Sequence, residues 1–378
     1  MKKEKYFLIA LLLLAVCLLA ACRSAEAEEE PADSGYPIQW ADAAIEYVVR
    51  RELDMPAGTI MSGDLKNIRI LTIRASHIQV NNNVIYRLSE EQDVKRLDDL
   101  VHFPRLGGLK ISHTALSDLS VLSELTELKQ LYIFENPNVT DISAIAGLPK
   151  LVTLVLRDNA IDDFDPVRAV STLVELDLSR CRLRSFEADG LLTSLRRLKL
   201  DSNYIDDISF LAGMTELREL DLSANLISDI TPLQNLVNLQ KLSLNNNAIS
   251  DLSPLAGFTD LAMLNISHNR IGDISPLSTL TRLSTLNFTN NQVSDLTPLA
   301  PLRQMRVLNT TGNTFTSVQP LAGMRRMLEL NLSENTISDV SSLRKLNRMN
   351  RLNLSGSGVA QFEIDVLRKA LPKCNIIV

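Results

Sequence analysis

The chain has 378 residues, of which 45% are hydrophobic and 22% are charged, with 14 glycines, 14 prolines and 4 cysteines. This composition excludes a collagen, a wholly disordered chain and a small disulfide-rich protein. The formal net charge is -6. A chain of this charge has no general electrostatic reason to bind nucleic acid, so we expect no nucleic-acid partner.

The first 21 residues have the pattern of an export signal. Lysines at positions 2, 3 and 5 precede an uncharged apolar run from Tyr6 to Ala21, which is too short to span a bilayer comfortably. The end of this run resembles the lipobox of bacterial lipoproteins: Leu19-Ala20-Ala21-Cys22. An ordinary secretory signal followed by a chance cysteine is the alternative.

The lipobox resemblance implies that residues 1–21 are a lipoprotein signal peptide and that Cys22 is lipidated. Acyl chains would hold the protein at a membrane without spanning it, because each buried methylene contributes about 0.8 kcal/mol. The implied location is a bacterial cell membrane, facing outside the cytoplasm; the residues do not distinguish an inner from an outer membrane. Residues 22–36 are rich in acids and have almost nothing large to bury, so we expect an acidic flexible tether.

A repeat of 22 residues fills most of the remaining chain. Its pattern is Leu-x-x-Leu-x-Leu-x-x-Asn-x-Ile, as in the segment from Leu217 to Ile227. The spacing is 22 residues throughout, apart from one inserted residue near Pro137, and residues 106–359 therefore contain twelve units. The asparagine position forms a column of mostly small polar residues: Thr114, Asn136, Asn159, Cys181, Asn203, Asn225, Asn247, Asn269, Asn291, Asn313, Asn335 and Ser357.

These units resemble the leucine-rich repeat family, in particular the 22-residue type of internalin-like bacterial surface proteins. The resemblance implies an α/β solenoid, a horseshoe with a parallel sheet on its concave side and 3-10 or turn structure on its convex side. The residues agree, because alternation places Leu220 and Leu222 on one face of a short strand and Asp221 and Ser223 on the other. One unit cannot bury its apolar row alone, whereas a stack of twelve can.

The two ends of the repeat array differ from its middle, as a solenoid requires. Residues 37–105 are predicted to form a helical N-terminal cap and an irregular first repeat, with a first strand near residues 68–73. The path of residues 79–105 is left open. Residues 360–378 are predicted to form a C-terminal cap, in which a helix is followed by a closing strand.

Three recurring positions have structural explanations. The asparagine column is expected in the turn after each strand, where its amides satisfy buried backbone groups. Aspartates four residues later, such as Asp229, occur once per repeat, which favours a turn or capping role over calcium binding. Prolines such as Pro232 usually follow Ser or Thr and are expected to start short helical turns.

Cys181 and Cys374 lie about eight repeats apart, too far for a disulfide, so we expect two free thiols.

The outward positions of the strands would form the concave surface, where members of this family usually bind proteins. Aromatic residues and arginine are typical of binding hot spots. The alternative is that residues 79–105 fold over the aromatic side chains and make them core. The C-terminal part of the face, from Asn265 to Ser355, is a carpet of Asn, Ser and Thr that either binds a glycan or forms a structural ladder. The candidate protein-binding residues lie in the N-terminal part: Arg74, Lys110, Tyr132, Phe134, Val155 and Arg157.

The sequence shows no arrangement typical of catalysis. The histidines, at positions 77, 102, 113 and 268, have no metal-binding spacing, and no glycine-rich loop joins a strand to a helix. We therefore predict no enzymatic activity, no cofactor and no metal. The predicted function is that of a membrane-anchored, monomeric recognition lipoprotein that holds an unidentified protein ligand on its concave face. The alternatives are a structural or scaffolding envelope lipoprotein and a module that binds cell-wall glycan.

Overall fold

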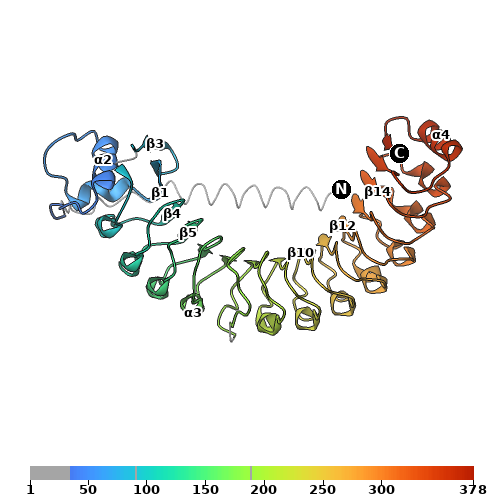
Figure 1. Ribbon diagram of the computed structural model, residues 1–378, viewed down its shortest axis with the longest axis horizontal. Coiled ribbons are helices and arrows are strands. Elements are labelled where there is room, and N and C mark those ends of the chain that lie inside the picture. Colours follow the sequence, from blue (N-terminus) through green and yellow to red (C-terminus); the bar gives the residue numbers. More distant parts are fainter. Residues whose placement is uncertain (1–34, 90–91, 188–189) are drawn as a thin grey trace, which may run out of the picture.

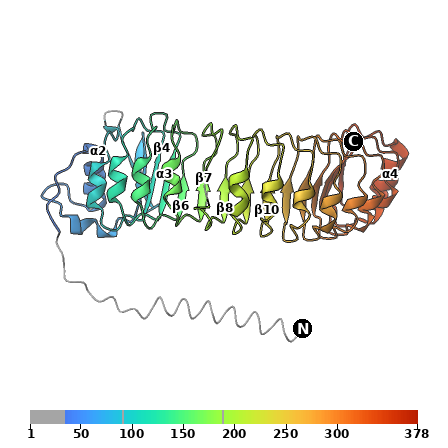
Figure 2. The same ribbon diagram turned by 90° about the horizontal axis from the view of Figure 1, so that it is seen from below.

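The computed structural model of the protein describes residues 35–89, 92–187 and 190–378. These residues form an open arc, in which strands line the concave side and short helical turns line the convex side (Figures 1 and 2). The predicted horseshoe solenoid is thereby confirmed. No helix within these ranges is long and apolar enough to cross a membrane. The predicted signal peptide, Cys22 and most of the predicted tether lie outside the described residues.

The described strands form one 16-stranded sheet. β2 and β3 are antiparallel additions at one edge, and the other strands pair in parallel from β1 and β4 to β16. The strands are β1 (Ile70–Arg74), β2 (His77–Val80), β3 (Val84–Arg87), β4 (Gly108–Ser112), β5 (Gln130–Phe134), β6 (Thr153–Val155), β7 (Glu175–Asp177), β8 (Arg197–Lys199), β9 (Glu219–Asp221), β10 (Lys241–Ser243), β11 (Met263–Asn265), β12 (Thr285–Asn287), β13 (Val307–Asn309), β14 (Glu329–Asn331), β15 (Arg351–Asn353) and β16 (Asn375–Ile377).

The helices are short between the strands and longer at the two ends of the arc (Figure 1). The α-helices are α2 (Ala43–Glu52), α3 (Asp165–Arg168) and α4 (Gln361–Ala370). The 3-10 helices are η1 (Ser62–Asn67), η3 (Asp98–His102), η4 (Ser120–Glu124), η5 (Ser143–Gly147), η6 (Ser209–Gly213), η7 (Thr231–Leu233), η8 (Ser253–Leu255), η9 (Ser275–Thr279), η10 (Thr297–Leu299), η11 (Gln319–Gly323) and η12 (Ser341–Lys345).

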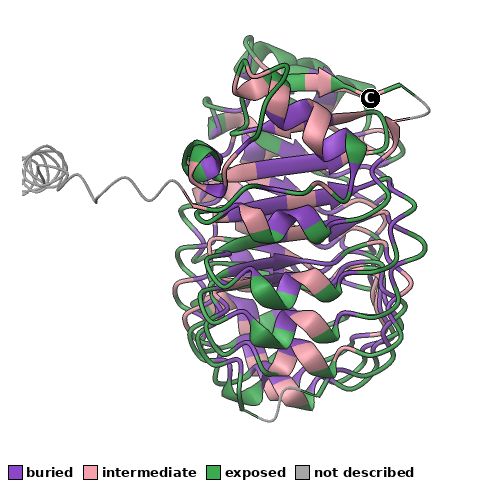
Figure 3. Ribbon diagram, turned by 90° about the vertical axis from the view of Figure 1, so that its left-hand side faces the viewer, coloured by how far each residue is buried: buried purple, intermediate pink, exposed green. Residues whose placement is uncertain are grey.

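Consecutive parallel strands keep one register. Leu220 pairs with Leu242, and Leu242 pairs with Leu264, so paired residues are one repeat of 22 residues apart. Leu131 pairs with Leu154, and the inserted residue is absorbed in the loop between them. These leucines are buried, and the interior of the solenoid is filled by such stacked rows, with exposed residues on the surrounding loops (Figure 3).

The asparagine column connects each turn to the preceding unit. Asn203 Nδ2 donates to the carbonyl oxygens of Leu178 and Leu200, both at 2.9 Å. Its Oδ1 accepts hydrogen bonds from the backbone N–H groups of Cys181 and Leu183, both at 3.0 Å. One amide thus satisfies buried backbone groups of two repeats, which would otherwise be costly to remove from water. The structural role predicted for this column is confirmed.

The aspartate and proline columns begin the convex turns. Asp229 Oδ1 accepts a hydrogen bond from the Thr231 backbone N–H at 2.8 Å, and Pro232 lies in the first turn of η7. Hydrogen bonds from the Thr231 side chain and backbone hold the pKa of Asp229 below its usual value. The turn role predicted for the aspartates and the start of a helical turn predicted at the prolines are therefore confirmed, whereas η7 has no side-chain cap at its N-cap residue Ile230.

The N-terminal cap closes one end of the apolar core. Helix α2 begins after Asp42, whose carboxylate accepts hydrogen bonds from the N–H groups of Ala44 and Ile45. One face of the helix is buried against the sheet, and includes Val48 and Val49. These hydrogen bonds satisfy two N–H donors in the first turn that have no partner inside the helix.

The path of residues 79–105 was left open by the sequence; of these, the described residues 79–89 belong to an antiparallel hairpin, and residues 92–105 include η3. The hairpin extends the sheet at its edge, since β2 pairs with β1 and β3 pairs with β2. Leu100 and Phe103 then return to the core. At the opposite end, α4 buries Ile364 and Leu367, and β16 pairs with β15, as predicted for the closing helix and strand.

Replacement of one asparagine in the column tests its role in stability. Asn291 Nδ2 donates to the carbonyl oxygens of Ile266 and Phe288, and its Oδ1 accepts from the Ile271 N–H, each at 3.0 Å. Asn291→Ala leaves these buried groups unpaired and is expected to lower the free energy of unfolding by roughly 2–4 kcal/mol. Urea denaturation followed by circular dichroism measures the change.

The exposed Asn347, in the loop after η12, supplies the matched control. Asn347→Ala is expected to change the free energy of unfolding by less than about 0.5 kcal/mol. Equal effects of the two substitutions would contradict the role assigned to the column.

Candidate functional site

The concave face has three zones along the arc, because the register aligns equivalent residues of successive strands. Strands β1 to β6 carry cations and aromatic residues, strands β7 and β9 carry acids on either side of the cations of β8, and strands β11 to β15 carry asparagines. All the candidate residues predicted from the sequence, apart from Cys22, fall in the first zone. We call the group around Phe134 the cationic cluster: Arg74, Lys110 and Arg157.

Phe134 lies at the centre of the cationic cluster. The Lys110 Nζ is 5.0 Å from the centroid of the Phe134 ring, and the guanidinium carbon of Arg157 is 4.8 Å from it. These side chains come from the repeats on either side and leave Phe134 only 6% exposed. Phe134 is therefore a buried platform, and Arg157 and part of Lys110 are what a ligand would meet.

The charges of the cluster are not neutralised within the described residues. No ion pair joins Arg74, Lys110 or Arg157 to a carboxylate there, whereas Arg197 and Lys199 on β8 pair with acids of β7 at 3.3 and 3.9 Å. Burial, followed by the charges of Arg74 and Arg157, lowers the pKa of Lys110. The cluster therefore holds like charges close together, which costs free energy unless an anion joins them.

A hollow of about 220 Å³, which we call the recess, adjoins the cluster. Gly108, at the start of β4, lines this hollow, and a side chain there would meet Ile70 at 3.3 Å. Tyr132 borders the hollow and is half-buried; burial, followed by the charge of Glu175, raises its pKa. Lys110 borders the hollow as well, together with polar Thr72 and Gln130, so a partly apolar recess and a cation lie side by side.

The sequence analysis missed Gly108 and Ser112. Gly108 stands at an outward strand position where most other repeats have a side chain, and that gap in the pattern is the signal that could have revealed the hollow. Val155, in contrast, was predicted as a surface contact and is only 9% exposed. The structure thus brings Arg74, Lys110 and Arg157 together around Phe134, with Tyr132 beside them.

The C-terminal zone is a hydrogen-bonded network of its own side chains. Asn265 Nδ2 donates to Asn245 Oδ1 at 2.8 Å, and Ser267 Oγ donates to Asn265 Oδ1 at 2.8 Å. Ser333 and Ser355 donate in the same way to the asparagine two residues before each of them. These polar groups already have partners, which supports the structural ladder over a glycan site.

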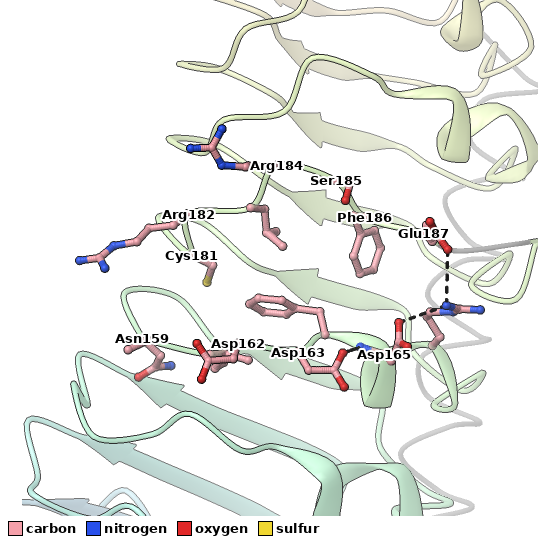
Figure 4. A pocket seen from close by; sticks show the side chains of 15 residues that line it. Asn159, Asp162, Asp163, Asp165, Cys181, Arg182, Arg184, Ser185, Phe186 and Glu187 are labelled. Carbon is pink, nitrogen blue, oxygen red and sulfur yellow. Dashed lines mark hydrogen bonds and ion pairs between the residues drawn. The ribbon is translucent and has the colours of Figure 1, made fainter.

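A larger hollow of about 660 Å³ lies between the segments that follow β6 and β7 (Figure 4). It coincides with Cys181, the thiol in the asparagine column. The Cys181 Sγ donates to the Leu156 carbonyl oxygen at 3.3 Å, but a thiol lacks the amide oxygen that Asn203 offers to the preceding unit. Of the charged residues here, Arg168 pairs with Asp165 and Glu187.

The contents of this larger hollow do not form a reactive site. Arg182 and Arg184 point outward from it (Figure 4). In the part of the chain that the structure describes, no three His, Cys, Asp or Glu side chains are placed to hold a metal ion. The cationic cluster with its adjoining recess therefore remains the better candidate for ligand binding.

Comparisons with known proteins identify the repeats. A model described as leucine rich repeat matches residues 171–227, and one described as leucine rich repeats (2 copies) matches residues 215–257 and 259–301. The chain therefore carries leucine-rich repeats, and neither model indicates an enzyme. None of the curated proteins compared with the chain matches it.

Several solved structures share the fold. An internalin (inlF) of Listeria monocytogenes is 26% identical, with a TM-score of 0.79 over 89% of this chain and 94% of that one. The functional domain of InlJ of the same organism is 18% identical, with a TM-score of 0.69 over 91% and 76%. A leucine-rich repeat protein of Leptospira interrogans is 20% identical, with a TM-score of 0.60 over 75% and 86%. The chain is similar to these proteins along most of its length.

The two described thiols are free, as predicted, and should differ in reactivity. Burial raises the pKa of Cys181 to about 12; burial also raises the pKa of Cys374, whose side chain is partly exposed. Because only the thiolate is nucleophilic, we expect iodoacetamide at pH 8 to modify Cys374 and to spare Cys181 until the chain is unfolded in urea. Peptide mass spectrometry resolves the two sites. Equal modification of both in the folded protein would contradict this result.

Proposed function

We propose that this leucine-rich repeat chain is a non-catalytic recognition protein, which binds a protein ligand through the N-terminal zone of its concave face. The observation that carries the proposal is the cationic cluster beside the recess of Tyr132, since an exposed arginine and a half-buried tyrosine next to a partly apolar recess have the composition of a binding hot spot. The similarity to internalins along most of the chain supports the same reading.

We further propose that the protein is a lipoprotein anchored at a bacterial membrane through Cys22. The support for this part is the apolar run that ends in Leu19-Ala20-Ala21-Cys22. An acidic tether would then separate the lipid from the repeats. The 22-residue internalin-like type is supported by the register of the strands, in which paired leucines recur every 22 residues.

The binding of a cell-wall glycan is the second candidate function. The asparagine-rich zone offers many amides, but its side chains hydrogen bond to one another. A glycan would have to replace these bonds, so the net gain in free energy would be small. The N-terminal zone has cations without such partners and is therefore the stronger site.

Tyr132→Ala tests the recognition function. A protein ligand captured from envelope extracts by the full-length protein in detergent should bind this variant roughly 30-fold more weakly, because a hot-spot truncation costs about 2 kcal/mol. Surface plasmon resonance with the purified ligand measures the dissociation constant.

Tyr204→Ala is the matched control, because Tyr204 is 51% exposed and lies in the turn beyond β8 instead of on the concave sheet. Its affinity should be unchanged. Unchanged binding by Tyr132→Ala, or retention of wall polymer alone by all three proteins, would refute the proposed protein ligand and direct attention to the asparagine-rich zone.

Cys22→Ala tests the membrane anchor. The protein with its natural sequence should take up radiolabelled palmitate and partition into the detergent phase of Triton X-114, whereas the variant should do neither because it has no acylated thiol. Cys374→Ala is the control and should partition as the protein with its natural sequence does. Palmitate uptake by the Cys22 variant would rule out the lipidation proposed here.

A further inference from the structure

We infer that the ligand meets the cationic cluster with an acidic protein segment, whose carboxylates bind Lys110, Arg157 and Arg74 while a neighbouring apolar side chain enters the recess beside Tyr132. This inference rests on the proposed function, because it specifies the chemistry of the ligand at the same site. Three observations support it: the cluster has no ion pair with a carboxylate of the described residues, the Ser112 hydroxyl has no hydrogen-bond partner, and a partly apolar recess lies beside Lys110.

The first argument is the charge of the cluster. Lys110 and Arg157 contact the Phe134 ring from the repeats on its two sides, and an aromatic ring attracts a cation more weakly than a carboxylate does. Their positive charge is therefore stabilised without being neutralised. The Arg74 Nε in the neighbouring strand is buried and has no hydrogen-bond partner. A carboxylate is the group that would complete these donors.

The second argument is Ser112, which lies between Arg74 and Phe134 in the register. Its side chain is fully buried and its Oγ has no hydrogen-bond partner. At the equivalent position of later repeats the Thr289 hydroxyl likewise has no partner, whereas the serines are satisfied. Ser179 Oγ donates to Asp177 Oδ1 at 2.5 Å, and Ser223 Oγ donates to Asp221 Oδ1 at 2.6 Å.

The difference arises two residues earlier in each strand. Asp177 precedes Ser179 and supplies an acceptor oxygen, whereas Lys110 precedes Ser112 and supplies only donors. Asp177 also lies 3.9 Å from the Lys199 Nζ of the next strand. In the acidic zone a carboxylate therefore lies beside a hydroxyl and a lysine. At β4 the lysine and the hydroxyl are present, but the carboxylate is missing.

The recess beside the cluster separates a protein ligand from other anions. Ile70 and Tyr132 form its apolar part, and Thr72, Asn82, Gln130 and Lys110 form its polar part. A polyphosphate or a wall phosphate polymer has charge to match the cluster but no apolar group to fill the recess. An acidic segment that carries a Leu or Phe satisfies both.

The neighbouring acids restrict how such a segment can lie. Asp177, Asp201 and Asp221 occupy the concave face of β7 to β9 and its following turns. Like charges across an interface repel one another and weaken binding. The acidic segment is therefore directed toward β1 and the hairpin, and the remainder of the ligand faces the middle of the arc.

The experiment uses the full-length protein in detergent and a fluorescein-labelled peptide of ten residues, in which glutamates flank a central leucine. A peptide with glutamine at every glutamate position is its neutral counterpart. Fluorescence anisotropy should show at least tenfold tighter binding of the glutamate peptide, and added NaCl should weaken that binding because the charges become screened.

The double variant Lys110→Gln, Arg157→Gln should lose about tenfold or more of the affinity for the glutamate peptide and should bind the glutamine peptide as before. Lys241→Gln, which removes an exposed lysine of the concave face at β10, is the matched control and should bind as the unmodified protein does. Thermal unfolding by circular dichroism should be unchanged in both, which establishes that they fold.

Equal affinity for the two peptides, equal losses in the double variant and in Lys241→Gln, or full displacement of the peptide by an equal charge concentration of polyphosphate would each overturn the inference. These outcomes are separate from the fate of the proposed function. A ligand that depends on Tyr132, together with a glutamate peptide that does not bind, would leave protein recognition in place and refute only the acidic segment.

Discussion

The whole arc depends on the hydrogen bonds that one asparagine side chain makes in most of the repeats. Its amide donates to carbonyl oxygens of its own turn and of the previous repeat, and its oxygen accepts from backbone N–H groups of the previous repeat, as at Asn203. When tight turns stack against one another, water cannot reach their backbone N–H and C=O groups. Repeats can therefore stack only where these groups have hydrogen-bond partners within the protein. The leucine rows supply the driving force for stacking, and the asparagine makes the stacked turns compatible with buried backbone.

The exception in this column shows the same constraint from the other side. Cys181 retains a hydrogen bond to the Leu156 carbonyl oxygen but offers no amide oxygen, and the hollow of about 660 Å³ lies at this repeat. The strands on both sides keep their parallel pairing through β6, β7 and β8. A local loss of acceptors therefore opens the loops without breaking the sheet, because the leucine rows remain continuous.

The fixed register also explains how a recognition surface can be built by single substitutions. Residues one repeat apart become neighbours across the sheet, so Phe134 is contacted by Lys110 from the repeat before it and by Arg157 from the repeat after it. The same rule aligns the acids of β7 to β9 and the asparagines beyond them. A ligand that spans several strands can read the order of these zones, which is how an otherwise uniform scaffold acquires specificity.

The repeated spacing of the sequence determined most of the fold. The leucine pattern predicted the parallel strands and their inward faces, and the Asn, Asp and Pro columns predicted the turns, because each depends on local geometry that recurs in every repeat. The capping helix and closing strand were predicted from the residues that follow the last repeat, and the two free thiols from the number of repeats that separate them. The lipid anchor at Cys22 remains a prediction from the sequence.

Only the tertiary structure decided the form of the candidate site. Phe134 appeared from alternation to be an exposed contact, but side chains from the repeats on both sides cover it, and no local pattern specifies how far Lys110 and Arg157 bend over its ring. The hairpin of β2 and β3 has no repeat to predict its course. The recess at Gly108 and the unpartnered hydroxyl of Ser112 depend on which residues stand beside them in neighbouring strands, and a site of that kind exists only after the repeats have stacked.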